Sequence, residues 1–215
     1  MKIIEISKNV IHIDFKSRYL LASSFMRMQE FYESPYPEIQ GKYFTIEQYM
    51  DRYAKDMGNF TYTRDWSGFN IPGHVMKAFL KTFEYKEGLL HSPEFFQKEL
   101  KLINAVYPFL KSRDKIYVIG TFKNKVGVLQ HELAHAFYYL DENYAKEMDD
   151  AVNELPYMAK IVRKLEKMGY GKNVLYDEIQ AYLSTSSPEY LKNSFKISNP
   201  PKKLRKIFKR KVKEI

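Results

Sequence analysis

Residues 116–140 read IYVIGTFKNKVGVLQHELAHAFYYL. The first seven of them are rich in β-branched and aromatic side chains, which is typical of a strand over 116–122. After Asn124, which can cap a helix, apolar residues recur at the spacing of one helix face. The stretch therefore predicts a strand that leads directly into a helix over about 125–140.

That helix contains HELAH at residues 131–135. Residues four apart lie on one face of a helix, so His131 and His135 can present both imidazoles to a single metal ion. Glu132 lies about 100° further round the helix, where its carboxylate can take a proton from a metal-bound water. The pattern predicts a catalytic metal centre with two histidine ligands and Glu132 as the general base.

HELAH is informative here because the chain has only five histidines. By random placement, an HExxH string would arise in such a chain with a probability on the order of one in a hundred. The competing interpretation is a helix with two histidines that pair for structural reasons. The apolar flanks and the preceding strand favour the metal centre, since an edge strand can hold an extended peptide near the metal.

Residues 116–140 resemble the active-site strand and helix of zincin metallopeptidases. The resemblance implies a zincin-like core, in which a small sheet has its edge strand at about 116–122, before the active-site helix. It further implies Zn²⁺ as the cofactor, His131 and His135 as metal ligands, Glu132 as the catalytic base, and hydrolysis of peptide bonds.

A third protein ligand would complete a catalytic zinc site, and Asp141 is one candidate for it. Metzincins have a glycine three residues after the second histidine, where the chain turns back toward the metal. Tyr138 stands at that position here, and it resists the positive φ that the turn needs. Asp141 is therefore favoured as the N-cap of the following helix.

Glu178 is the preferred third metal ligand. Residues 178–181, EIQA, are similar to the ExxA pattern of several small gluzincins, and the small Ala181 would allow close approach to the HELAH helix. The gap of 43 residues between His135 and Glu178 is longer than the short form of thermolysin-like gluzincins. Other carboxylates that remain alternatives are Glu142, Glu147 and Glu154.

Tyr182 is the preferred donor to the oxyanion that forms when water attacks a carbonyl, because it lies one helical turn from Glu178 on the same face. Thermolysin-like gluzincins have at that position an aspartate that orients a ligand histidine. Asp177 is the candidate for that work in this chain. The rivals of Tyr182 as oxyanion donor are Tyr170, Tyr176 and His74.

Periodicity and turn residues predict a mainly helical α+β protein with few strands. A strand or hairpin is expected over 2–15 and a turn-rich segment over 58–73. The expected helices cover about 17–33, 46–57 with a Thr45–Gln48 capping box, 72–84, 93–112, 125–140, 141–168 with a break at Pro156, and a segment that begins at Asp177.

A length of 215 residues suits one domain, or one domain with a subsidiary lobe. The predicted division has an N-terminal helical and β lobe over 1–90, which can cover the cleft. A zincin-like catalytic core follows over 91–200, and a basic C-terminal helix or tail over 201–215. A single domain that contains all three parts is the alternative.

The net charge of +9 is unevenly placed. Residues 202–215 hold eight basic residues and one acid, so the rest of the chain is nearly neutral. Apolar residues at helical spacing in this tail favour a helix that docks on the domain and leaves its lysines in water. Contact of the tail with nucleic acid or an anionic surface is the less favoured interpretation.

The chain has no cysteine, which excludes disulfides, thiolate nucleophiles and Cys-ligated zinc. Residues 1–11 lack the unbroken apolar core of a signal peptide, and no stretch has the length of a membrane span. A cytoplasmic protein is expected, with signal-independent export as the alternative.

The predicted function is that of a zinc-dependent metallopeptidase, in which Glu132 activates a metal-bound water and the partner is a peptide or protein substrate. The alternative is a non-catalytic zinc-binding or interaction module. Such a module would bind a protein or a nucleic acid.

Overall fold

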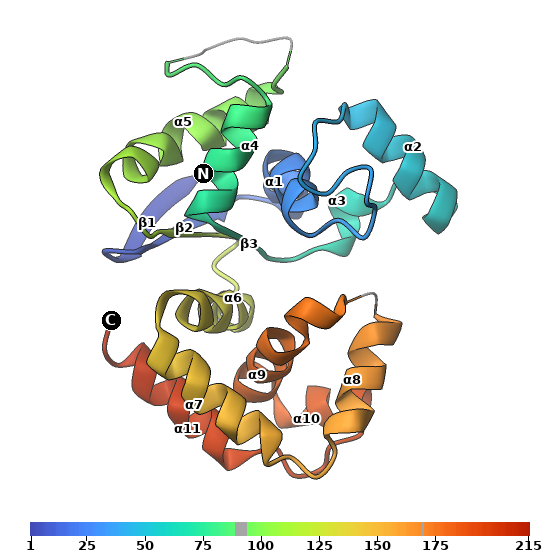
Figure 1. Cartoon of the computed structure of the whole chain (residues 1–215), viewed down its shortest axis with the longest axis vertical. Helices are drawn as coiled ribbons and strands as arrows, with labels where there is room; N and C mark the ends of the chain where they lie inside the picture. Colours follow the sequence, from blue (N-terminus) through green and yellow to red (C-terminus); the bar gives the residue numbers. More distant parts are fainter. Residues whose placement is uncertain (89–93, 169) are drawn as a thin grey trace. The chain divides into compact units, whose positions relative to one another are not determined.

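The computed structural model of the chain describes residues 1–88, 94–168 and 170–215. In these residues the chain is α+β and mostly helical, with a mixed sheet of four strands, which confirms the predicted class in outline (Figure 1). The chain divides into two units, Met1–Lys125 and Val126–Ile215. None of the helices in the described part combines the length and apolar character that crossing a bilayer requires.

The sheet lies in the first unit and has the strand order β1-β2-β4-β3. β1 and β2 form the expected antiparallel hairpin, β2 and β4 run parallel, and β3 runs antiparallel to β4. The strands are β1 (Lys2–Ser7), β2 (Val10–Phe15), β3 (Phe69–Pro72) and β4 (Tyr117–Phe122). Parallel neighbours need a long crossover, and the segment between β2 and β4 forms the helices of this unit.

The prediction that residues 116–122 form an edge strand is wrong. β4 lies between β2 and β3, and all six of its residues are buried. The signal for β3 was weak, because that strand is short, lies in a turn-rich segment and ends in Pro72. Proline is tolerated there because β3 is itself an edge strand. The strand that precedes the HELAH helix therefore has no open edge on which a peptide could lie.

The helices of the first unit are α1 (Arg18–Glu33), α2 (Ile46–Met57), α3 (Tyr62–Asp65), α4 (Gly73–Thr82) and α5 (Gln97–Ser112). α1 packs on β2, β3 and β4. A Cβ added to Gly120 of β4 would lie 2.6 Å from the ring of Phe25, so the glycine lets α1 lie close on the sheet. The Phe25 ring in turn stacks on Phe69 of β3, at 5.5 Å between centroids.

Capping residues in the sequence predicted the start of α2 correctly, whereas the predicted start of α5 cannot be compared with the structure in the same way. The capping box of Thr45 and Gln48 is present at the start of α2, as predicted. The predicted start of the next long helix at residue 93 lies outside the described residues. The structure describes α5 from Gln97, and the carboxylate of Glu99 accepts a hydrogen bond from the backbone N–H of Phe96 at 2.9 Å.

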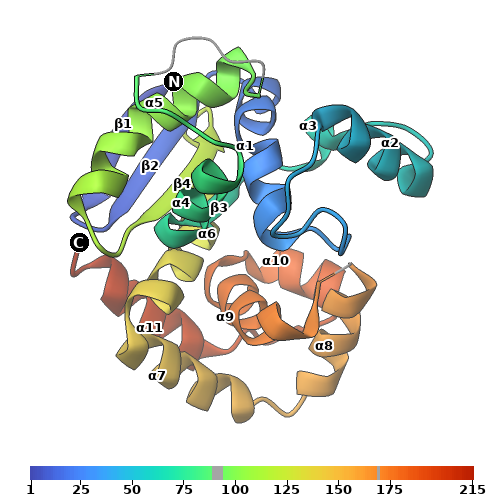
Figure 2. The same ribbon diagram turned by 45° about the horizontal axis from the view of Figure 1, so that its top comes forward.

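The second unit is helical throughout its described part. Its longer helices are α6 (Val126–Leu140), α7 (Glu142–Asn153), α8 (Met158–Lys167), α9 (Leu175–Thr185) and α11 (Lys202–Val212). Shorter turns are η1 (Lys172–Val174), α10 (Pro188–Tyr190) and η2 (Leu191–Phe195). α9 packs against α6, α7, α8 and α11 and so forms the centre of this unit (Figure 2).

Several predictions for this unit are confirmed. The expected break near Pro156 separates α7 from α8. α11 docks through its apolar side, since Leu204, Ile207 and Phe208 are buried. α11 packs on α7 and α9.

Along the chain, the boundary between the two units falls between residues 125 and 126, whereas the predicted boundaries fall at 90/91 and 200/201. α5 and β4 were assigned to the catalytic core by sequence, but α5 packs on α1 and β4 pairs with β2 and β3. The HELAH helix α6 lies in the same unit as the helices that follow it, as the predicted core also had it.

Candidate metal centre

α6 carries HELAH, and it places both histidine rings together as the spacing predicts. The Nε2 atoms of His131 and His135 lie 3.3 Å apart, and the ring planes stand nearly perpendicular, at 85°. His135 is buried, with 4% of its side chain exposed, whereas His131 is 20% exposed. One imidazole is thus fixed inside the unit and the other lies at its margin.

α9 brings Glu178 to the same point. Its Oε1 lies 3.7 Å from Nε2 of His135, and its Oε2 lies 3.9 Å from Nε2 of His131. One ligand atom from each of the three residues falls within 4.8 Å of the others. Ligands held about 2.1 Å from a tetrahedral ion are about 3.4 Å apart, so the donor set fits a metal ion of this kind.

The packing of α6 on α9 explains why these residues converge. Ala134 and Ala136 on α6 and Ala181 on α9 are wholly buried. The backbone of Ala181 also acts on His131, where it opposes the lowering of the pKa of that imidazole. Small side chains at a helix contact allow the two backbones to approach, which is the property that singled out Ala181 in the sequence.

A chain of hydrogen bonds orients His135. Its Nδ1 lies 2.9 Å from Oδ1 of Asp177, and Nε2 of Gln180 donates to the same oxygen at 2.9 Å. The hydroxyl of Tyr144 donates to Oε1 of Gln180 at 3.1 Å. A carboxylate on one ring nitrogen fixes the imidazole so that the other nitrogen faces the centre. The sequence suggested Asp177 for this position, but neither Gln180 nor Tyr144.

The two histidines have opposite electrostatic surroundings. Burial lowers the pKa of His131 well below its ordinary value, and the charge of His135 adds to this effect. Burial also acts to lower the pKa of His135, but nearby carboxylates, with Asp177 foremost, raise it well above its ordinary value. Negative charge therefore collects around His135. Such a place favours a cation, because metal binding displaces the proton from a ligand imidazole.

Glu132 and two tyrosines border the centre. Glu132 is buried on α6, one residue beyond the first histidine. The ring of Tyr182 lies 4.7 Å from the ring of His131, and its hydroxyl lies 3.0 Å from that of Tyr170. Burial raises the pKa of Tyr182, so its hydroxyl keeps its proton and can act as a donor. Tyr182 and Tyr170 thus form a pair beside the predicted metal ligands.

The other candidate oxyanion donors lie elsewhere. The hydroxyl of Tyr176 donates to Oδ1 of Asn153 at 2.7 Å, on the side where α9 meets the end of α7. His74 is in α4 and belongs to the first unit. Of the four residues considered for this role, the structure brings Tyr170 and Tyr182 together.

Asp141 has the role of a helix cap, as predicted. Its Oδ1 accepts hydrogen bonds from the backbone N–H groups of Asn143 and Tyr144 at the start of α7. Its Oδ2 lies 2.6 Å from Nζ of Lys211, and this ammonium group lowers the pKa of the carboxyl. Both oxygens are therefore engaged away from the histidines.

The remaining carboxylates considered as ligands are directed to other partners or to solvent. Glu147 pairs with Arg210, Glu154 pairs with Lys203, and Glu142 is exposed in the first turn of α7.

Comparison of the chain with protein-family models, with curated proteins and with solved structures finds no match to any of them.

Proposed function

We propose that this chain is a zinc-dependent metallopeptidase, with His131, His135 and Glu178 as the metal ligands. The observation that carries the proposal is that the carboxylate of Glu178, from a helix far along the chain, lies within 3.9 Å of the Nε2 atoms of both HExxH histidines. Such a convergence needs the specific packing of α9 on α6. Two histidines that pair for structural reasons would need no such third residue.

The donor set favours zinc among the biological metals. Two imidazoles and one carboxylate are a common ligand set of catalytic zinc sites, whereas calcium and magnesium prefer sites made of oxygen alone. Three protein ligands leave a fourth position for water or substrate. The contact of Asp177 with His135 is the supporting carboxylate that ligand histidines usually have.

Each neighbouring side chain has a distinct role in the proposed hydrolysis. A zinc ion held here would polarise the scissile carbonyl and lower the pKa of water. Glu132 takes the proton of the attacking water and passes it to the leaving amine. Tyr182 donates a hydrogen bond to the carbonyl oxygen as negative charge develops on it, and Tyr170 holds the Tyr182 hydroxyl in place.

The decisive variant is Glu132→Gln, which keeps the shape of the side chain and removes its basicity. It should retain one zinc per chain, by metal analysis, and lose cleavage of a quenched fluorogenic peptide library by about 10²- to 10⁴-fold. Glu142→Gln on the exposed start of α7 is the matched control and should match the wild type in both measurements. Undiminished cleavage by Glu132→Gln would refute the mechanism.

The metal ligands are tested separately from catalysis. Metal analysis of Glu178→Ala beside Asp141→Ala should show loss of zinc in the first variant and retention in the second. Zinc bound by the wild type without any peptide cleavage would instead favour a non-catalytic zinc module.

A further inference from the structure

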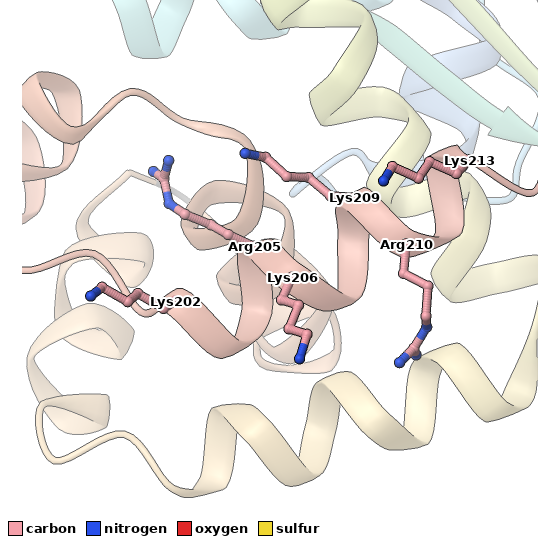
Figure 3. A pocket seen from close by; sticks show the side chains of 6 residues that line it. All are labelled: Lys202, Arg205, Lys206, Lys209, Arg210 and Lys213. Carbon is pink, nitrogen blue, oxygen red and sulfur yellow. The ribbon is translucent and has the colours of Figure 1, made fainter.

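The outward side of α11 carries two rows of basic side chains (Figure 3). Residues four apart lie above one another on a helix, so one row is formed by Lys202, Lys206 and Arg210 and the other by Arg205, Lys209 and Lys213. In Figure 3, Lys206 and Arg210 extend to one side of the helix and the second row to the other. Between them lies an open hollow of about 530 Å³, which we call the α11 trough.

A separate set of α11 cations is neutralised by acids of α7 and its cap. Lys203 pairs with Glu154 at 2.7 Å and Lys211 pairs with Asp141 at 2.6 Å. Arg210, at the edge of the trough, pairs with Glu147. These contacts fix α11 on α7 and account for the basic residues on that side.

The lysines of the trough have no such partners. Lys202, Lys206, Lys209 and Lys213 are all exposed, and none of their ammonium groups forms an ion pair or hydrogen bond within the described part of the chain. Fixing four like charges on one short helix face is unfavourable by itself, because neighbours at this spacing repel each other. A polyanion would relieve that repulsion.

The buried side of α11 decides which polyanion fits. Leu204, Ile207 and Phe208 pack inside the second unit, so the helix has no free apolar face to insert into a bilayer. Protein interfaces are depleted in lysine and in charged residues at their centre, whereas every side chain that lines the trough is a lysine or an arginine. Contacts to phosphate groups, in contrast, need only cations and hydrogen-bond donors.

We propose that the α11 trough binds the phosphate backbone of a nucleic acid without preference for sequence. From Lys202 to Lys213 the helix extends about 17 Å, a length over which a duplex presents about ten phosphate charges. No aromatic side chain lines the trough, so it has no surface on which bases could stack. This surface is independent of the proposed peptidase centre.

The experiment measures binding of two fluorescein-labelled 20-bp DNA duplexes of unrelated sequence by anisotropy, from 50 to 200 mM NaCl. We expect equal affinity for both sequences. Five contacts, from the four lysines and Arg205, predict an affinity about 500-fold weaker at the higher salt concentration. A single-stranded oligonucleotide of equal length tells which form of the backbone fits better.

The test variant is Lys202→Gln/Lys206→Gln/Lys209→Gln/Lys213→Gln, which leaves the ion pairs and the buried face of α11 unchanged. Its affinity at 50 mM NaCl should fall at least tenfold, and the one remaining contact, from Arg205, should leave a salt dependence of about 3.5-fold. The matched control removes four lysines of the same unit that lie outside α11, Lys164, Lys167, Lys172 and Lys192. It should bind within about threefold of the wild type.

Three results would overturn the proposal. One is the absence of binding to both nucleic acid forms at 50 mM NaCl. Another is an equal loss of affinity in the control variant, which would assign binding to net charge alone. The third is binding to phosphatidylserine vesicles that the test variant loses, with no binding to nucleic acid, which would make the trough a lipid surface. Circular dichroism of both variants verifies that each is folded.

Discussion

The two units bury charged side chains in opposite ways. In the first unit, Arg27 and Glu99 form a two-pronged ion pair, with Nε–Oε1 at 2.8 Å and Nη2–Oε2 at 2.6 Å. In the second unit, the carboxylate of Glu178 faces two histidine nitrogens at 3.7 and 3.9 Å. The first arrangement compensates charge within the protein. The second spaces three donors around a common point, which suits an added cation.

The two clusters also differ in their hydrogen-bond partners and in their exposure to solvent. The guanidinium of Arg27 also donates to the backbone oxygen of Glu94 at 2.6 Å and lies over the ring of Phe83. Its partners are thus all supplied by the first unit, and both side chains are at most 3% exposed. His131 is 20% exposed, so the second cluster is accessible from solvent. The comparison distinguishes a buried pair whose charges compensate each other from a cluster of three donor groups that could hold a metal ion.

The largest expected effect is the loss of metal from the second cluster. His131→Ala or His135→Ala should weaken zinc binding on the order of 10⁴-fold, as measured by titration against a competing chelator, because two ligands hold zinc far less tightly than three. At free zinc of 1,000 times the dissociation constant, the wild type should gain about 4 kcal/mol of stability, and these variants almost none. His74→Ala, on the exposed side of α4, is the matched control. Unchanged zinc affinity in the two test variants would remove the distinction between the clusters.

The next effect is on the first cluster. Glu99→Gln leaves Arg27 buried without an anion and should cost about 3–5 kcal/mol in the free energy of unfolding. Urea unfolding followed by fluorescence measures it, because Trp66 is the only tryptophan and lies in the first unit. Adding Arg27→Met to this variant should recover most of the loss, since the double variant contains no unpaired charge. Recovery of less than about 1 kcal/mol would indicate that the ion pair is not the source of the effect.

The histidine pair was predictable from sequence, while its supporting residues were not. Spacing along one helix places His131 beside His135, whatever surrounds them. Glu178 needed a second signal, which was the small Ala181 at a helix contact. Gln180 and Tyr144 lie on α9 and α7, and their hydrogen bond depends on how these helices pack. No local pattern contains that information.

The sheet shows what local sequence signals do not determine: the order in which strands pair. Residues 116–122 have clear strand propensity, but their position within the sheet depends on which strands pair with them. β3 has four residues and ends in proline, so periodicity does not detect it. The hairpin of β1 and β2 and the capping box of α2 were predictable, because each is determined by residues close together in the chain.

A smaller loss of zinc affinity is expected when Asp177, which orients His135 in the second cluster, is replaced. Asp177→Asn should lower zinc affinity about 10- to 100-fold, because the amide orients His135 less well and lacks the charge that favours a bound cation. A chelator titration measures the change. Asp149→Asn on α7 is the matched control. The carboxylate of Asp149 accepts a hydrogen bond from the hydroxyl of Tyr138 and not from a histidine, so this variant should leave zinc affinity unchanged. Equal losses in both variants would assign the effect to net charge.

A buried carboxyl without a cation should make stability depend on pH. Burial raises the pKa of Glu30 above 4.5, although hydroxyls of Tyr62, Tyr49 and Ser34 oppose this shift. The folded state then holds its proton more tightly than the unfolded state, so stability falls as pH rises from about 4.5 through the raised pKa. One such group contributes at most about 1.4 kcal/mol per pH unit. Glu30→Gln should remove this contribution in urea unfolding between pH 4 and 7, and an unchanged pH dependence would contradict it.

The smallest effect is expected at Asp141, which lies directly after the HELAH helix but caps α7. Asp141→Ala should cost about 1 kcal/mol of stability, because the N–H groups of Asn143 and Tyr144 lose their acceptor. Its zinc affinity should stay within about twofold of the wild type. Asp141→Asn keeps the cap and removes the charge beside Lys211, so it should recover most of the stability. Loss of zinc in both variants would contradict this assignment. Asp141 would then be a fourth donor of the second cluster, which the comparison of the two clusters describes with three.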